Sequence, residues 1–200
     1  MSLLRKLEVS LVIVWLLTGV AFLLLMCHLS FALNAIFGIV FLTMFYVYVR
    51  KRHRLGLPPT LLVLVYLALL IDALGNLFGM YGSKFGPLQF DEFSHLSVQI
   101  LVSPILVWLT QKSLEKMGHR LELALTAFFA ATTMFSISAA YEIIELWDHL
   151  YFHPGRIWSP IDTATDLQFD LVGIVVGTLL ACLMLRVKMV SNTRVDQFAS

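Results

Sequence analysis

Long apolar runs separated by short polar stretches fill most of this 200-residue chain. A helix that crosses the hydrocarbon core of a bilayer needs about 20 predominantly apolar residues. The pattern therefore predicts an all-α fold, a polytopic membrane helix bundle in which one transmembrane domain spans 1–200. We expect its six transmembrane helices near residues 9–27, 30–49, 58–80, 92–110, 121–146 and 168–189.

The boundary between the first two predicted helices is the least clearly marked in the sequence, because residues 11–49 are almost continuously apolar. A single helix of that length would measure about 58 Å, roughly twice the thickness of the hydrocarbon core. Two helices joined by a tight hairpin fit better. The first apolar run is also longer than the core of a secretory signal peptide, so we interpret it as a retained span.

Composition supports the membrane interpretation. Hydrophobic residues make up 59% of the chain and charged residues 14%, with a mean hydropathy of +0.85. Soluble domains carry about 25% charged residues. The net charge of +1 gives no indication of a nucleic-acid partner.

The basic residues are distributed unevenly about the predicted helices. With six spans, twelve of the 14 Lys and Arg residues fall on one side, and only Lys84 and Arg156 fall on the other. Basic loops stay in the cytoplasm. The asymmetry predicts a protein of the cytoplasmic (inner) membrane with both termini cytoplasmic.

Acidic residues show the opposite bias. Nine of the 13 Asp and Glu residues fall in the outer half of the predicted bundle. They are Asp72, Asp91, Glu92, Glu142, Glu145, Asp148, Asp162, Asp166 and Asp170. Clustered carboxylates in a poorly solvated place must share protons or bind a cation.

Helical spacing groups these acids into stripes, because residues three, four and seven apart share a helix face. Asp91 and His95 form one stripe, Glu142, Glu145 and His149 a second, and the acids at 162, 166 and 170 a third. An acid at a helix N-terminus is also a common cap, which leaves that simpler interpretation open for Asp91, Glu92, Asp162 and Asp166. It fits Glu142 and Glu145 poorly, because they approach a helix C-terminus.

Carboxylate ligands favour Mg²⁺, Mn²⁺ or Ca²⁺, and an added imidazole would also admit Zn²⁺ or Fe. We therefore predict a divalent metal ion (Mg²⁺, Mn²⁺ or Zn²⁺) held by Glu142, Glu145, Asp166 and Asp170. Asp91 and His95 are the predicted catalytic residues, as general base or further ligand. Secondary candidates are Asp72, Tyr141, His149 and Gln168.

Two glycines four residues apart, Gly173 and Gly177, lie in the last predicted helix. Small residues at this spacing allow the backbones of two membrane helices to approach closely. We expect this face to pack tightly against a neighbouring helix.

Three motifs, "DEFSH" (91–95), "YEIIELW" (141–147) and "DLQFDLVG" (166–173), together resemble the YjdF family of bacterial inner-membrane proteins. The chain resembles the VanZ-like family more distantly. The resemblance covers roughly residues 55–185 and implies a polytopic membrane protein, without an established activity. The VanZ-like likeness implies a link to the cell envelope or its lipids.

The leading functional hypothesis is a metal-dependent enzyme that acts on a lipid or lipid-linked envelope substrate at the outer leaflet. One alternative is a small cation- or proton-coupled carrier, which at this length would need to form a homo-oligomer. Another is a non-catalytic envelope membrane protein whose acidic mouth recruits a basic partner. Membrane lipid is the expected partner in each case, and the residues alone leave the choice between enzyme and carrier open.

Overall fold

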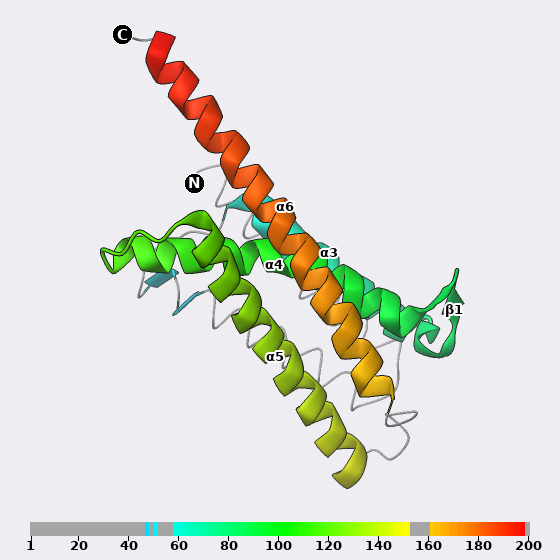
Figure 1. Ribbon diagram of the computed structural model, residues 1–200. Coiled ribbons are helices and arrows are strands. Elements are labelled where there is room, and N and C mark those ends of the chain that lie inside the picture. The colour runs from blue at the N-terminus through cyan, green and yellow to red at the C-terminus, as the bar shows by residue number, and fades with distance from the viewer. Residues whose placement is uncertain (1–46, 49, 52–57, 153–160, 199–200) are drawn as a thin grey trace. The chain divides into compact units, whose positions relative to one another are not determined.

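The computed structural model describes residues 47–48, 50–51, 58–152 and 161–198 (Figure 1). Helices dominate this part of the chain. The first two predicted spans, 9–27 and 30–49, lie almost wholly outside the described residues. The chain divides into two compact units, Met1–Ser94 and His95–Ser200, which are taken here one at a time.

The described elements run in the order α3, η1, β1, β2, α4, α5 and α6. Among them, three helices are long and apolar enough to cross a membrane, and they match the predicted spans 92–110, 121–146 and 168–189. Each helix is longer than predicted. The bounds of these three are α4, Phe90–Lys116; α5, Leu123–Tyr151; and α6, Asp162–Phe198.

The first unit contains α3 (Pro59–Leu77), which lies within the predicted span 58–80. The apolar stretch identified in this helix, Val63–Asp72, is shorter than a span. A short 3-10 helix, η1 (Met80–Gly82), follows. A hairpin then pairs β1 (Lys84–Phe85) with β2 (Leu88–Gln89), and the all-α prediction did not include it.

Helix α4 has recognisable signals at both ends. The backbone N–H of Gln89 donates to Glu92 Oε2 at 2.9 Å, which caps the first turn. At the other end Gly118 has a φ of +81°, and His119 N–H donates to the carbonyl of Leu114. This arrangement is the Schellman motif, which satisfies the last carbonyl groups of a helix. The predicted capping role is thus found at Glu92.

In the second unit, α5 and α6 run antiparallel and pack side by side (Figure 1). Helix α6 also packs on α4 through its two spaced glycines. A Cβ atom on Gly173 would lie 2.5 Å from the Leu96 carbonyl oxygen, and one on Gly177 would lie 2.6 Å from the Ile100 carbonyl oxygen. No larger side chain fits at either position without moving a helix. The predicted close approach at these glycines is confirmed.

A small apolar core lies in the middle of this unit. Val107 of α4, Ala130 of α5 and Ala181 of α6 are buried together. Toward the N-terminal end of α6, the buried residues of the same helices become polar. The change from apolar to polar burial marks where the candidate site begins.

Candidate functional site

Three helices contribute buried polar side chains to one place in the second unit. On α4 the face is set by residues four apart, His95, Gln99 and Ser103. On α5 the same spacing places Ser138 and Glu142 on the buried face. On α6 it places Asp166 and Asp170 on the buried face. Side chains spaced four residues apart on three helices thus form one cluster.

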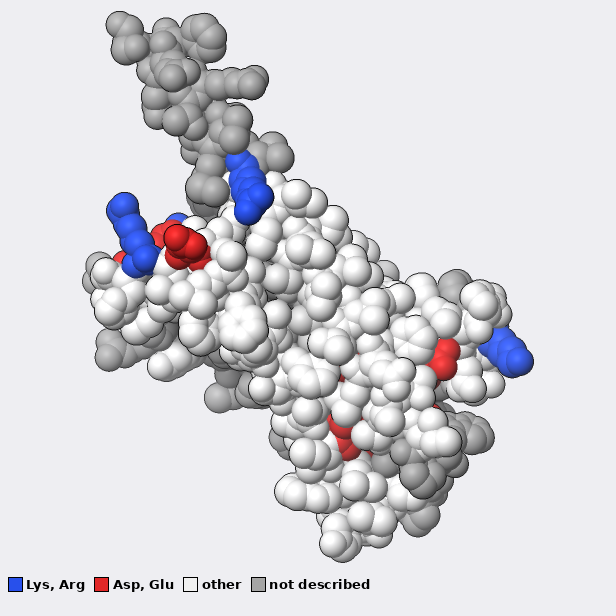
Figure 2. Space-filling view, in the orientation of Figure 1, with Lys and Arg blue, Asp and Glu red and all other residues white. Residues whose placement is uncertain are grey.

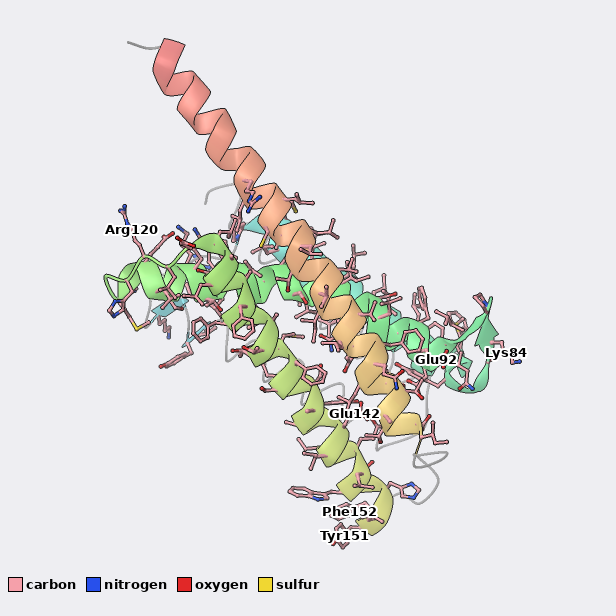
Figure 3. The ribbon with its side chains drawn as sticks, viewed as in Figure 1. Lys84, Glu92, Arg120, Glu142, Tyr151 and Phe152 are labelled. Carbon is pink, nitrogen blue, oxygen red and sulfur yellow. The ribbon has the colours of Figure 1, made fainter. Side chains whose placement is uncertain are left out.

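Figure 3 shows Glu142 on the side of α5 that faces α6. His95 lies at the centre of the cluster. Its Nδ1 atom is 3.0 Å from Asp170 Oδ1, a hydrogen-bond distance, and its Nε2 atom is 3.9 Å from Glu142 Oε1. Gln99 Nε2 donates to the same Asp170 oxygen at 3.0 Å and to Ser138 Oγ at 2.7 Å.

These contacts determine which ring nitrogen of His95 carries the proton. The Asp170 carboxylate can only accept hydrogen bonds, so a neutral imidazole places its proton on Nδ1. The lone pair is then on Nε2, the nitrogen that lies 3.9 Å from Glu142 Oε1. A carboxylate that orients the ring of a ligating histidine in this way is a recurrent feature of metal sites.

The carboxylates of the cluster are removed from water. Glu142 is 3% exposed and Asp170 1% exposed. On the face drawn in Figure 2, the Lys and Arg side chains stand out at the surface, whereas some acidic atoms appear only in gaps between uncharged side chains. One imidazolium could offset at most one of these two charges, and burying the other would cost several kcal/mol. Compensation for the second charge can come from a basic side chain, a proton or a cation.

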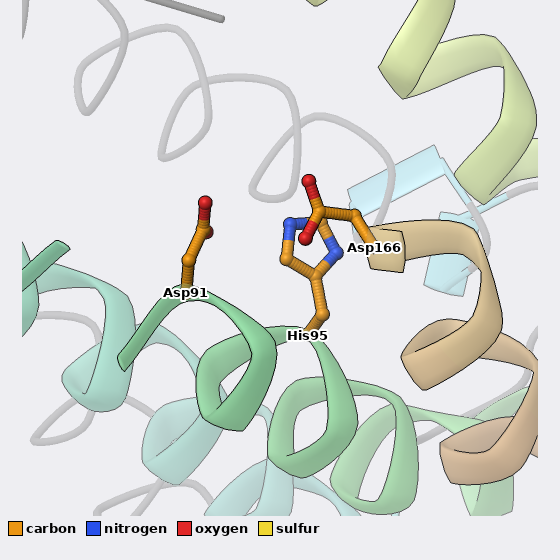
Figure 4. A group of neighbouring side chains, drawn as sticks. All are labelled: Asp91, His95 and Asp166. Carbon is orange, nitrogen blue, oxygen red and sulfur yellow. The ribbon is translucent and has the colours of Figure 1, made fainter. Parts of the chain in front are cut away.

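A group of one histidine and two acids can hold a metal ion here. Ligand atoms of His95, Glu142 and Asp170 all lie within 4.8 Å of one another. Asp166, which is also buried, presents an oxygen to His95 within the same limit. Figure 4 shows Asp91 and His95 rising from successive turns of α4, with Asp166 beside the imidazole ring.

Two buried polar atoms in these helices have no hydrogen-bond partner among the described residues: Gln99 Oε1 and Thr178 Oγ1. Leaving a buried acceptor unsatisfied costs about 1–3 kcal/mol. The Gln99 oxygen belongs to the amide group that holds Asp170, so it lies within the cluster.

Several predicted site residues lie away from this cluster. Glu145 is half-buried and belongs to neither ligand group found among the described residues, and its predicted role as a ligand stays a prediction. Tyr141 and Gln168 are exposed, on other faces of their helices, and His149 is half-buried near the end of α5. Asp72 belongs to the first unit, where it accepts a hydrogen bond from Tyr81.

The sequence interpretation missed Gln99 and Ser138. A signal for Gln99 was available, because it follows His95 by four residues and so shares its helix face. Ser138 likewise precedes Glu142 by four residues. A serine or glutamine in an apolar helix attracts less attention than an acid, because it carries no charge to neutralise.

The second unit also has a surface cavity of about 420 Å³, which is remote from the carboxylates. It lies at the turn between α4 and α5 and is lined by Gln111 and Arg120, among others. Gln111 follows His95 by 16 residues, about 24 Å along the helix. Figure 3 shows Arg120 at this far end. The cavity is therefore separate from the ligand cluster.

Comparison with known proteins identifies a family for nearly the whole chain. Residues 8–187 match the family described as "Predicted membrane protein (DUF2238)". No curated protein and no solved structure matches the chain. The match agrees with the predicted membrane location and is not specific to the YjdF or VanZ-like families. The chain belongs to the DUF2238 family of predicted membrane proteins.

Proposed function

We propose that the protein is a divalent-cation-dependent membrane enzyme that acts on a lipid or lipid-linked envelope substrate. One observation carries the proposal: a histidine and two buried acids from three helices, His95, Glu142 and Asp170, present ligand atoms within 4.8 Å of one another. The centre would lie near the outer surface of the inner membrane, with both termini cytoplasmic. The strong bias of the basic residues supports this orientation.

The distances favour different roles for the two acids. A metal ion lies about 2.0–2.2 Å from nitrogen and oxygen ligands, which separates two ligands by about 3.4 Å at a tetrahedral angle and about 4.2 Å when they are opposite. The 3.9 Å between His95 Nε2 and Glu142 Oε1 lies in this range and is too long for a hydrogen bond. The 3.0 Å contact of Asp170 is a hydrogen bond. Glu142 and His95 are thus the proposed ligands, and Asp170 holds the imidazole.

The mixed ligand set narrows the choice of cation. Imidazole nitrogen favours Zn²⁺ and other transition metals, whereas sites for Mg²⁺ are built from oxygen atoms. Zn²⁺ or Mn²⁺ therefore fits the centre better than Mg²⁺. A bound cation there would act as a Lewis acid on a substrate oxygen or activate a water molecule.

The surroundings of the centre support a substrate from the lipid phase. Ile143 and Ile144, next to Glu142, are 51% and 59% exposed, and Leu171 and Val172, next to Asp170, are 48% and 52% exposed. Apolar side chains exposed on membrane-spanning helices face lipid. A substrate in the lipid phase would therefore lie next to the helices that carry the centre.

Removal of metal gives the first test. Protein purified in detergent should contain about one equivalent of Zn²⁺ or Mn²⁺ by elemental mass spectrometry. Chelation should lower the unfolding temperature, and adding back the ion at 100 times its Kd should restore about 2.7 kcal/mol of stability. Metal-free protein that is equally stable and binds neither ion would contradict the proposal.

Asparagine at position 170 tests the role assigned to that acid. Its side-chain oxygen can still accept from His95 Nδ1, but it carries no charge. We expect Asp170→Asn to weaken metal binding by about 10- to 100-fold, the range for residues that orient a ligand. Titration calorimetry measures the change. Retention of wild-type affinity would contradict the assigned role.

Turnover is tested by incubating the metal-loaded protein with a membrane lipid extract and following the lipids by mass spectrometry. We expect a lipid species to change with the loaded protein and to remain unchanged with the metal-free protein. Glu142→Gln serves as the inactive control.

The carrier alternative is supported by a continuous hydrogen-bonded series that links Ser138, Gln99, Asp170 and His95. The carboxylate and imidazole of this series, Asp170 and His95, could exchange protons, with Gln99 and Ser138 holding them in place. The apolar cluster of Val107, Ala130 and Ala181 lies farther along the same helices and would have to open for transport. Cation or proton flux into proteoliposomes, without any change in the lipids, would favour the carrier.

A further inference from the structure

We propose that Gln99 Oε1 accepts a hydrogen bond from a water molecule bound to the cation, and so fixes that water in the centre. The inference rests on the proposed function, because the cation is the one held by His95 and Glu142. It adds a positioning residue that neither the charged stripes nor the family match indicates.

The orientation of the Gln99 amide follows from its partners. Both hydrogen atoms on Nε2 are used, one toward Ser138 Oγ at 2.7 Å and one toward Asp170 Oδ1 at 3.0 Å. The reversed amide would bring its oxygen to 3.0 Å from the carboxylate, and two acceptors repel each other at that distance. The oxygen must therefore be the atom that lacks a partner among the described residues.

This oxygen is deeply buried, since Gln99 is 7% exposed. The side-chain donors beside it are already engaged, because His95 Nδ1–H and Gln99 Nε2–H both donate to Asp170. No donor from the described residues reaches this oxygen, so a molecule bound beside it could supply the missing hydrogen bond. Buried waters characteristically satisfy such polar groups.

A cation explains why this water would be held firmly. A metal ion polarises a bound water and makes its O–H groups strong donors. An amide oxygen accepts such a bond without taking the proton, because it is not a base at neutral pH. Gln99 would thus position the water, and a carboxylate oxygen that does not bind the cation, such as the second oxygen of Glu142, would take its proton.

The test uses the full-length protein in detergent, stripped of metal and reloaded with Mn²⁺. Oxygen-17 relaxation of the solvent reports how fast water leaves the bound Mn²⁺. In Gln99→Met, which is similar in length and has no amide oxygen, we expect water exchange to be about ten-fold faster, the equivalent of one hydrogen bond. The Mn²⁺ stoichiometry should stay the same.

Two further variants make the result specific. Gln99→Glu keeps an acceptor, because a carboxylic acid can donate its proton to Asp170 and retain a carbonyl oxygen, so exchange should stay close to the wild-type rate. Ser103→Ala is the matched control, since among the described residues the Ser103 hydroxyl bonds only the backbone carbonyl of Gln99, at 2.7 Å, and its removal should leave exchange unchanged. If Gln99→Met does not fold, Gln99→Asn takes its place, because the shorter side chain withdraws the oxygen.

The outcomes separate this inference from the proposed function. Wild-type protein that binds no Mn²⁺ refutes the metal centre, and this inference with it. Wild-type binding with unchanged water exchange in the folded variant refutes the role of Gln99 alone. Loss of Mn²⁺ from folded Gln99→Met would also overturn the inference, because Gln99 would then be needed to hold the cation itself, either directly or through Asp170.

Discussion

Replacing Glu142 with glutamine should weaken the binding of Zn²⁺ or Mn²⁺ by at least about 100-fold. Residues that only orient a ligand contribute 10- to 100-fold to metal affinity, and Glu142, 3.9 Å from His95 Nε2, is proposed as a ligand itself. The substitution keeps the shape of a side chain that is 3% exposed and removes its charge. Titration calorimetry on protein in detergent measures the loss.

The matched control is Glu145→Gln, which removes the same charge from the same helix three residues later. Glu145 is half-buried and lies outside both ligand groups found in the described part of the chain. A partly solvated charge contributes at most about 1 kcal/mol, or roughly five-fold in affinity. Equal losses in the two variants would mean that the whole acidic end attracts cations without a defined centre.

Much of this site could be anticipated from the sequence, because a charged side chain in an apolar membrane helix is energetically costly and therefore stands out. Carboxylates clustered in a poorly solvated place need compensation, and this argument put forward Glu142, Glu145, Asp166 and Asp170 as ligands. All of these except Glu145 are buried. The i, i+4 rule placed His95 with Asp91 on one helix face. The cap at Glu92 likewise follows from its place in the first turn of α4. The end of α4 at Lys116, beyond the predicted residue 110, depends on the turn at Gly118.

The rotation of each helix about its axis could not be predicted in the same way. Glu142 and Glu145 belong to one stripe by spacing, yet the buried face of α5 follows positions four apart and includes Ser138 and Glu142. Spacing alone cannot tell which edge of a stripe faces the neighbouring helices. That choice depends on packing between helices, which is set by residues far apart in the sequence.

The glycines of α6 show how the site depends on packing between helices, and replacing them should have a large effect. Gly177→Leu should unfold the second unit or separate α6 from α4. A Cβ atom there would lie 2.6 Å from the Ile100 carbonyl oxygen and 2.9 Å from Ser103 Cβ. Overpacking a core costs about 1–3 kcal/mol when side chains can yield. Here a backbone atom blocks the space, so we expect a loss at the upper end of that range or beyond.

Leucine at Gly173, one turn earlier in α6, should affect metal binding as well as helix packing. At Gly173 an added Cβ would meet Leu96 O at 2.5 Å and Gln99 Cβ at 2.8 Å. Pushing the helices apart there would pull Asp170 away from Gln99 and His95, so Gly173→Leu should lose metal binding as well as thermal stability. Thermal unfolding in detergent and metal titration measure the two effects.

Val176→Leu provides the comparison for both glycine variants, because Val176 is 38% exposed on the same helix and should change stability by no more than about 0.5 kcal/mol. If Gly173→Leu kept wild-type stability and metal affinity, α6 could not lie against α4 as described. The contacts of Asp170 with His95 and Gln99 depend on that approach, because the two glycines are what allow the backbones of α4 and α6 to come so close. The centre would then have to be assembled by some other packing of the three helices.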